Sequence, residues 1–118
     1  MPAPGDFLPM NPRDYLVLFS LTAGERHGYG IVKEVESQSA GAVRMDPSNL
    51  YRSVKRLMKL GLVAESELQQ DQDSDERRRF YSLTPLGTAA VEAEARRLSQ
   101  LTDAAKARKL ISRSGRPA

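Results

Sequence analysis

The pattern of hydrophobic and polar residues predicts helices in four parts of the chain. The first predicted helix runs from about Pro12 to Ala23 and contains the run 15–21, which is apolar on nearly every side. A buried strand is the alternative for such a run, but its length and the Asn11-Pro12 start favour a buried helix. We expect Gly24 to end this helix.

A second helix is predicted after the sequence ERHG, residues 25–28. Its apolar residues Ile31, Val32 and Val35 share one face, and the charged residues between them lie off that face. The small and polar sequence SQSAG, residues 37–41, breaks this pattern. The second helix is therefore expected to end there.

The third predicted helix, 47–60, has two chemically different faces. It begins at Asp46-Pro47, where the acid can cap the helix and proline fits its first position, and Gly61 can end it. At about 100° per residue, three apolar residues fall within about 60° of one another: Leu50, Val54 and Leu57. An arc of about 100° on the opposite side holds Ser48, Arg52, Lys55, Arg56 and Lys59. The apolar face suits a hydrophobic core. The opposite face suits an anionic partner, because the helix contains cations and no acid.

Two strands, 62–68 and 77–83, are predicted next, joined by a polar loop that is rich in acids. The fourth helix starts at Pro85 and could run to about Leu110. Three helices, a hairpin and a long helix form the order of a winged helix-turn-helix, a mainly α fold of the α+β class. The expected divisions are a disordered N-terminal segment, a DNA-binding domain, a dimerisation helix and a disordered basic tail, at 1–10, 11–83, 84–110 and 111–118.

Composition limits the chemistry of the chain. Its 118 residues suit one domain, and the absence of cysteine excludes disulfides and thiolate metal sites. With a single histidine, His27, we expect no metal, no cofactor and no catalytic triad. The longest apolar run, 15–19, is too short to span a bilayer, and the start lacks the pattern of a secretory signal. We therefore expect a cytoplasmic protein without a membrane partner.

The charge distribution points to a polyanion more clearly than the net charge of +3 does. A recognition helix must offer cations to phosphates and polar groups to base edges while its other face packs on its own domain. The third helix supplies both kinds of group, with Ser48 and Asn49 at the end that usually reaches deepest into the groove. Arginine can bond guanine with two hydrogen bonds and asparagine can do the same for adenine.

Three other motifs have more than one possible interpretation. Arg77, Arg78 and Arg79 could contact phosphates or a minor groove from the base of a wing, or could neutralise the loop acids. Tyr29 could contact a phosphate or pack in the core, and His27 is expected to cap or pack. The run Gly28-Tyr29-Gly30 lacks the third glycine of a dinucleotide loop, and the acids at 71–76 lack the glycine and terminal glutamate of a calcium loop.

The fourth helix is expected to mediate dimerisation. A helix of some 25 residues has more apolar length than one small domain can cover, although packing back on its own domain is the alternative. Its alanine-rich contacts bury little area each, so the first helix is expected to contribute to a shared core. The predicted dimer contacts are Tyr15, Phe19, Leu86, Ala90, Ala93, Leu98, Leu101 and Ala105.

Three sequences together resemble the PadR family of bacterial transcriptional regulators, in its short version with a single C-terminal helix: HGYGIVKEV, LYRSVKRLMKLGLV and RRRFYSLTPLGTAAVEAEARRL. The resemblance covers about residues 13–102. It implies a dimer with winged-helix heads and repression of nearby genes. It also places Tyr51 in or beside the major groove, Tyr29 near the backbone and Arg77 to Arg79 on the wing.

Two differences from the family bear on recognition. The family often has Gly-Thr before Leu-Tyr and proline after it, whereas this chain has Ser48-Asn49 and Arg52. These residues add hydrogen-bonding capacity, so the operator is expected to differ. Effectors vary within the family, and no residue of this chain identifies one.

The predicted function is that of a homodimeric, sequence-specific DNA-binding regulator, a repressor, acting on double-stranded DNA at a pseudo-palindromic operator. A winged-helix module that binds proteins without sequence-specific DNA binding is the alternative, supported by the acidic loop and the mild net charge. An enzyme is not expected, since no base, nucleophile and metal ligands occur in a recognisable arrangement.

Overall fold

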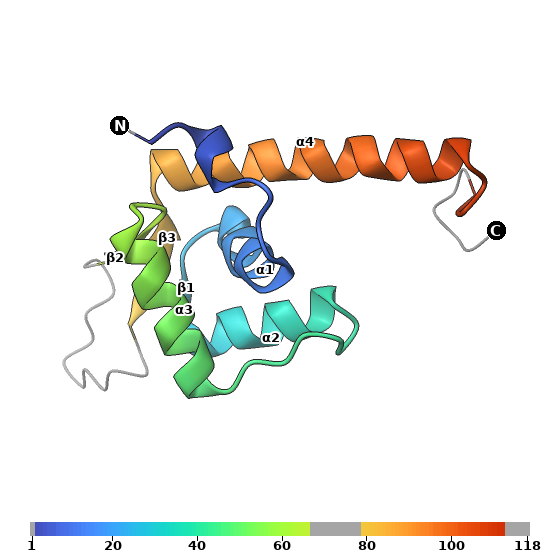
Figure 1. Ribbon diagram of the computed structural model, residues 1–118. Coiled ribbons are helices and arrows are strands. Elements are labelled where there is room, and N and C mark those ends of the chain that lie inside the picture. Colours follow the sequence, from blue (N-terminus) through green and yellow to red (C-terminus); the bar gives the residue numbers. More distant parts are fainter. Residues whose placement is uncertain (1, 67–78, 113–118) are drawn as a thin grey trace.

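The three-helix core is built from short helices that begin at local capping sites. The computed structural model describes residues 2–66 and 79–112, and Figure 1 shows their arrangement. Helix α1 is Pro12–Ser20, α2 is Gly28–Gln38 and α3 is Pro47–Lys59. Before α1, the Asn11 side chain accepts a hydrogen bond from the backbone N–H of Asp14, which satisfies a free donor of the first turn. The predicted starts of α1 and α3 are confirmed.

These helices also end at or shortly before the glycines that were predicted to end them. After α1 the chain forms one 3-10 turn, Leu21–Ala23, and Gly24 follows with φ 132°. Helix α2 stops at Gln38, and Gly41 in the next turn has φ 82°. After α3, Gly61 takes φ 81°, a left-handed conformation that glycine adopts without the Cβ clash of other residues.

The small antiparallel sheet contains one strand more than the sequence predicted. Strands β2, Val63–Ser66, and β3, Phe80–Leu83, pair as the expected hairpin, with Val63 opposite Leu83 and Ser66 opposite Phe80. Strand β1, Arg26–His27, pairs with the other edge of β3. A two-residue strand has no hydrophobic period of its own, and for this reason the sequence pattern did not reveal it.

The core lies where α1, α2 and α3 meet the sheet and the first half of α4, Pro85–Ala107 (Figure 1). All three predicted apolar residues of α3 are buried. The other buried hydrophobic side chains include Val17, Leu18, Ile31, Val35, Leu62, Ala90 and Val91. The mainly α winged-helix architecture with a long C-terminal helix is therefore confirmed.

The N-terminal segment is folded, which corrects the prediction of disorder for residues 2–10. It forms a 3-10 helix, Pro4–Phe7, that lies against α4 (Figure 1). The Phe7 and Met10 side chains pack on the core, and the Met10 backbone N–H donates to a carboxylate oxygen of Glu94 (2.9 Å). Its proline-rich composition suggested disorder, but burial of Phe7 and Met10 compensates for ordering the chain.

The C-terminal helix ends a little earlier than predicted. Lys109 takes φ 62°, and the Leu110 N–H donates back to the Ala105 carbonyl oxygen (2.9 Å), which ends α4 at Ala107. Most of the predicted disordered tail lies outside the described residues. Ile111 and Ser112 are described, and both are half-buried.

Candidate nucleic-acid interface

Helix α3 is held firmly at its N-terminus, where the predicted base-reading residues lie. The Asp46 carboxylate accepts from the Asn49 backbone N–H (2.8 Å) and, through its other oxygen, from the Asn49 side-chain amide (3.3 Å). The Arg52 guanidinium in turn donates to the Asn49 side-chain oxygen (3.4 Å). These contacts orient the Asn49 amide and the Arg52 side chain relative to each other. Ser48 is exposed beside them.

The outward face of α3 carries the predicted cations. Leu50, Val54 and Leu57 turn inward, and Ser53 is also buried at the margin of this packed face. Tyr51 is 46% exposed despite its aromatic ring, so this side chain is available to a partner. The remaining predicted contact residues of this helix are exposed as well: Arg52, Lys55, Arg56 and Lys59.

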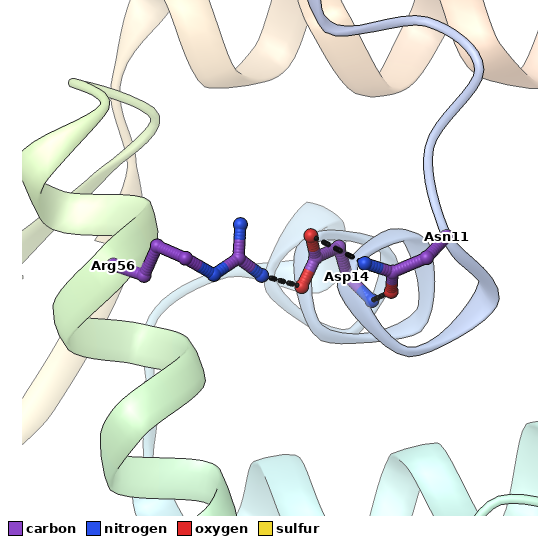
Figure 2. Close-up of polar contacts among 3 residues, drawn as sticks. All are labelled: Asn11, Asp14 and Arg56. Atoms are coloured by element: carbon purple, nitrogen blue, oxygen red, sulfur yellow. Dashed lines mark hydrogen bonds and ion pairs between the residues drawn. The ribbon is translucent and has the colours of Figure 1, made fainter.

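Arg56 differs from the other cations because its charge is already paired. Its guanidinium bonds the carboxylate of Asp14 on α1, and Asn11 holds the other oxygen of that carboxylate through its side-chain amide (3.0 Å; Figure 2). The Asp14 side chain is only 12% exposed, whereas that of Arg56 is 50% exposed. The hydrogen bond to Asp14 raises the pKa of Arg56. Arg56 therefore links α3 to α1 and offers less free charge than Lys55 or Lys59.

Three aromatic side chains contact one another at the start of α2, next to the sheet. His27 caps this helix, its Nδ1 accepting from the Gly30 backbone N–H (3.1 Å), as the sequence predicted. Its ring stacks with that of Tyr29 and meets Phe80 of β3 edge-on, with centroid distances of 6.3 and 5.7 Å. The Lys33 ammonium lies 5.3 Å from the centre of the Tyr29 ring, and hydrogen bonding to Tyr29 raises the pKa of Lys33.

Tyr29 packs on the surface rather than in the core, and its contact with a phosphate stays a prediction. Its ring packs on His27, yet the residue is 63% exposed. It lies on a part of the surface that borders both the start of α2 and strand β3. One face of the ring therefore packs on His27, while much of the side chain stays exposed.

One of the three wing arginines is described. Arg79 forms an ion pair with Glu65 across the β2–β3 hairpin (3.2 Å). Arg77, Arg78 and the acids of the connecting loop lie outside the described residues. The hypothesis of neutralisation by the loop acids therefore stays a prediction, with Glu65 as an acidic partner that sequence reasoning missed.

The sequence of residues 17–93 matches the family described as "Transcriptional regulator PadR-like family". The chain belongs to this family. No curated protein sequence matches it. The resemblance recognised in the sequence is confirmed, and so is the expectation that the protein is not an enzyme, because PadR-like proteins are transcriptional regulators.

Solved structures of related regulators share the fold of this PadR-like chain. A PadR family transcription regulator from Clostridium difficile is 20% identical, with a TM-score of 0.66 over 81% of this chain and 96% of the other. RosR from H. salinarum is 28% identical, with a TM-score of 0.63 over 80% of each chain. Bacillus subtilis PadR, solved in complex with operator DNA, is 24% identical, with a TM-score of 0.60 over 72% of this chain and 47% of that one.

One predicted dimer contact of the PadR-like chain is wrong. Ala90 is fully buried in the core of its own chain, because the first half of α4 packs on α1, so it cannot reach a partner. Leu86 and Tyr15 pack partly against this core and are half-buried. The other candidates keep exposed surface: Phe19, Ala93, Leu98, Leu101 and Ala105. Leu101 is 54% exposed on the half of α4 that extends beyond the winged domain (Figure 1).

Sequence reasoning missed a buried acid on the same helix. Glu94 is 1% exposed and bonds Arg97 through both carboxylate oxygens, in addition to the Met10 N–H. Hydrogen bonding to Arg97 lowers the pKa of Glu94 against the opposing effect of burial. Burial, and secondarily the Glu94 charge, raise the pKa of Tyr15. The spacing of Glu94 and Arg97 was visible in the sequence, but the folded N-terminal segment that buries Glu94 was not.

The described residues were also compared with the requirements of metal sites and of membrane-spanning helices. Residues 2–66 and 79–112 hold no group of three or more histidine, aspartate or glutamate side chains that could bind a metal ion. None of the helices in this part of the chain is long and apolar enough to cross a membrane.

Proposed function

We propose that the protein represses transcription by binding DNA as a homodimer with sequence specificity. The observation that carries this proposal is the division of α3 into a buried apolar face and an exposed face with cations and no acid. A helix of this kind fits the major groove, since its exposed face can meet phosphates while its N-terminal end reaches base edges. Repression would take place in the cytoplasm, where the operator lies.

Different residues of α3 would serve affinity and sequence selection. Lys55 and Lys59 are exposed cations that suit phosphate contacts, which supply most of the affinity of such complexes. Ser48, Asn49 and Arg52 lie at the N-terminal end and suit base contacts. Two hydrogen bonds support this assignment, because they fix the amide orientation before DNA arrives: the Asn49 amide donates to Asp46, and Arg52 donates to the Asn49 side-chain oxygen. Tyr51 would lie beside the groove, and Tyr29 would contact the backbone.

The proposed dimer would present two α3 helices to one face of the duplex. Major grooves on one face are about 34 Å apart, so a two-fold axis implies a pseudo-palindromic operator. The exposed half of α4 supports this proposal, because Leu98 and Leu101 offer apolar surface that its own domain does not fully cover. The Bacillus subtilis relative was solved with operator DNA, which supports the same class of partner here.

Fluorescence anisotropy tests the proposal directly. The purified protein is titrated against duplex DNA from its own promoter and against a scrambled duplex, at two salt concentrations. We expect the promoter duplex to bind tighter by about 10³-fold or more, with affinity falling steeply as salt rises. Equal and weak binding to both duplexes would contradict sequence-specific recognition of that promoter and would favour a protein partner for α3.

A further inference from the structure

An open hollow borders α3 on the side that faces α1. It has a volume of about 760 Å³ and lies between the start of α1, the α2–α3 connection at 42–44 and the middle of α3. Arginines from all three segments line it: Arg13, Arg44, Arg52 and Arg56. The ion pair in Figure 2 forms part of its wall, since Arg56 spans from α3 to Asp14 on α1.

The hollow is strongly cationic. Asp14 is the one acid among the described residues that line it, so four arginines against one aspartate leave three positive charges uncompensated. Within residues 2–66 and 79–112, neither Arg13 nor Arg44 forms an ion pair. Like charges from separate segments repel one another, and an anion placed between them would relieve that repulsion. Binding of an anion between these arginines would therefore be favourable.

The geometry favours a phosphate group as the anion. Guanidinium groups donate paired hydrogen bonds that match phosphate oxygens, and here they approach from different elements. Asp14 engages Arg56, which leaves Arg13 and Arg44 to contact the ligand. Arg52 belongs both to the hollow and to the proposed base-contacting end of α3. A phosphate in the hollow would therefore be adjacent to the DNA segment that α3 contacts.

We propose that this hollow binds a backbone phosphate of the operator, with Arg13 and Arg44 as phosphate contacts that no motif in the sequence identified. This inference rests on the proposed DNA binding. The open shape supports a phosphate within a continuous strand, because the strand can enter and leave the hollow. With α3 in the major groove, contacts from α1 and the α2–α3 connection would fix the orientation of the domain on the duplex.

The test uses the variant R13A/R44A of the full chain, in which both substituted side chains are exposed. We expect it to bind promoter and scrambled DNA more weakly by similar factors. The slope of log affinity against log salt should fall by about two, one for each lost phosphate contact. The loss of affinity between about 50 and 200 mM salt should then be about tenfold smaller than in the wild type.

The matched control is R108A/K109A, which removes two exposed charges at the far end of α4 (Figure 1). It should keep the wild-type slope. Circular dichroism of both variants reports whether the fold is kept. If the wild type binds promoter DNA with specificity and R13A/R44A keeps its salt slope, the phosphate site is refuted while the proposed function stands. If the wild type binds no DNA, the proposed function itself fails.

A last arm separates a strand phosphate from a free one. Inorganic phosphate is titrated into the wild type and into R13A/R44A by calorimetry at constant ionic strength. Saturable binding to the wild type alone, combined with unchanged DNA binding by the variant, would assign the hollow to a free anion and overturn the proposal. Weakened DNA binding with a lower slope in the variant supports the strand phosphate.

Discussion

At the scale of single residues, the closest constraint is at Gly87. A Cβ atom on this residue would lie 2.0 Å from the backbone carbonyl oxygen of Leu62. The glycine therefore allows α4 to approach the chain between α3 and β2. The approach is reinforced by Thr84, whose hydroxyl donates to the Gly61 carbonyl (2.6 Å) and accepts from the Gly87 N–H (2.9 Å).

Gly87→Ala should destabilise the protein by about 3 kcal/mol, because α4 or the Leu62 backbone would have to move in a packed region. Chemical denaturation of the variant and the wild type measures the difference. Gly30→Ala is the matched control, since its Cβ would meet no atom closer than 3.7 Å and alanine favours helix. A Gly87→Ala protein as stable as the control would contradict the close approach.

Glu94→Gln should lower the free energy of unfolding at neutral pH by about 2 kcal/mol, through loss of the charged hydrogen bonds to Arg97. The folded-state pKa of Glu94 lies below its ordinary 4.5, so the ionised carboxylate stabilises the fold above that pH. This stabilisation is lost as the pH falls through the folded-state pKa.

Denaturation at a series of acidic pH values measures this dependence. The Glu94→Gln variant should lose less stability on acidification than the wild type. Glu92→Gln, an exposed acid on the same helix, is the control and should follow the wild type. A parallel acid dependence for Glu94→Gln and the wild type would be inconsistent with the assigned role of Glu94.

At the scale of elements, α3 both packs one face into the core and exposes a cationic face. Asp46 caps its start, and Gly61 closes its end, where the Leu62 N–H donates to Leu57 O and the Gly61 N–H to Met58 O (both 3.0 Å). Those paired bonds form the C-terminal motif in which a left-handed glycine satisfies the last carbonyls. Because both ends are fixed, the orientation of the exposed cationic face follows from the packing of the buried one.

Two single substitutions on α3 separate its proposed roles. Lys55→Ala should weaken promoter and scrambled DNA by similar factors and reduce the salt slope by about one. Asn49→Ala should weaken the promoter complex by about 1–3 kcal/mol and leave scrambled DNA nearly unaffected. Anisotropy titrations at several salt concentrations measure both. An equal loss on all sequences for Asn49→Ala would remove this residue from base recognition.

Sequence patterns predicted the elements whose signals are local. The capped starts at Asn11, Asp46 and Thr84 depend on a side chain and a backbone N–H three residues away, so they were visible in the sequence. Strand β1 and the folded N-terminal segment depend on partners far along the chain, β3 and α4. Neither could be found from periodicity.

In the candidate site as well, local features were predictable and contacts between distant residues were not. The exposed cations of α3 were predictable because they face away from the apolar stripe of the same helix. The pairing of Arg56 with Asp14 joins residues 42 positions apart, and Arg13 and Arg44 come together only through the packing of α1 and the α2–α3 connection. These features required the tertiary structure.

At the scale of the whole molecule, the shape is set by α4. The molecule measures 54 × 34 × 21 Å, and α4 extends along it past α1 and α2 (Figure 1). Its first half completes the core of the winged domain, while its second half carries the exposed Leu101. A single helix thus belongs to the domain at one end and is available for association at the other.

Leu101→Glu should shift the proposed dimer toward monomer, because a charge would replace an apolar contact. Sedimentation velocity across a range of concentrations measures this change, and the wild type is expected to sediment as a dimer. Ser99→Glu adds the same charge to another exposed face of α4 and should leave the dimer intact. A monomeric wild type, or a Leu101→Glu variant as dimeric as the control, would contradict this use of α4.

The ion pair between Asp14 and Arg56 has a consequence for how such a regulator can be tuned. Replacing Asp14 with asparagine would release the Arg56 guanidinium and raise the local positive charge without altering any residue of α3. The protein would then bind all DNA sequences more tightly and fold somewhat less stably. The groups proposed to select the sequence would be unchanged. In the proposed DNA complex, residence time and choice of target would thus be set by different helices.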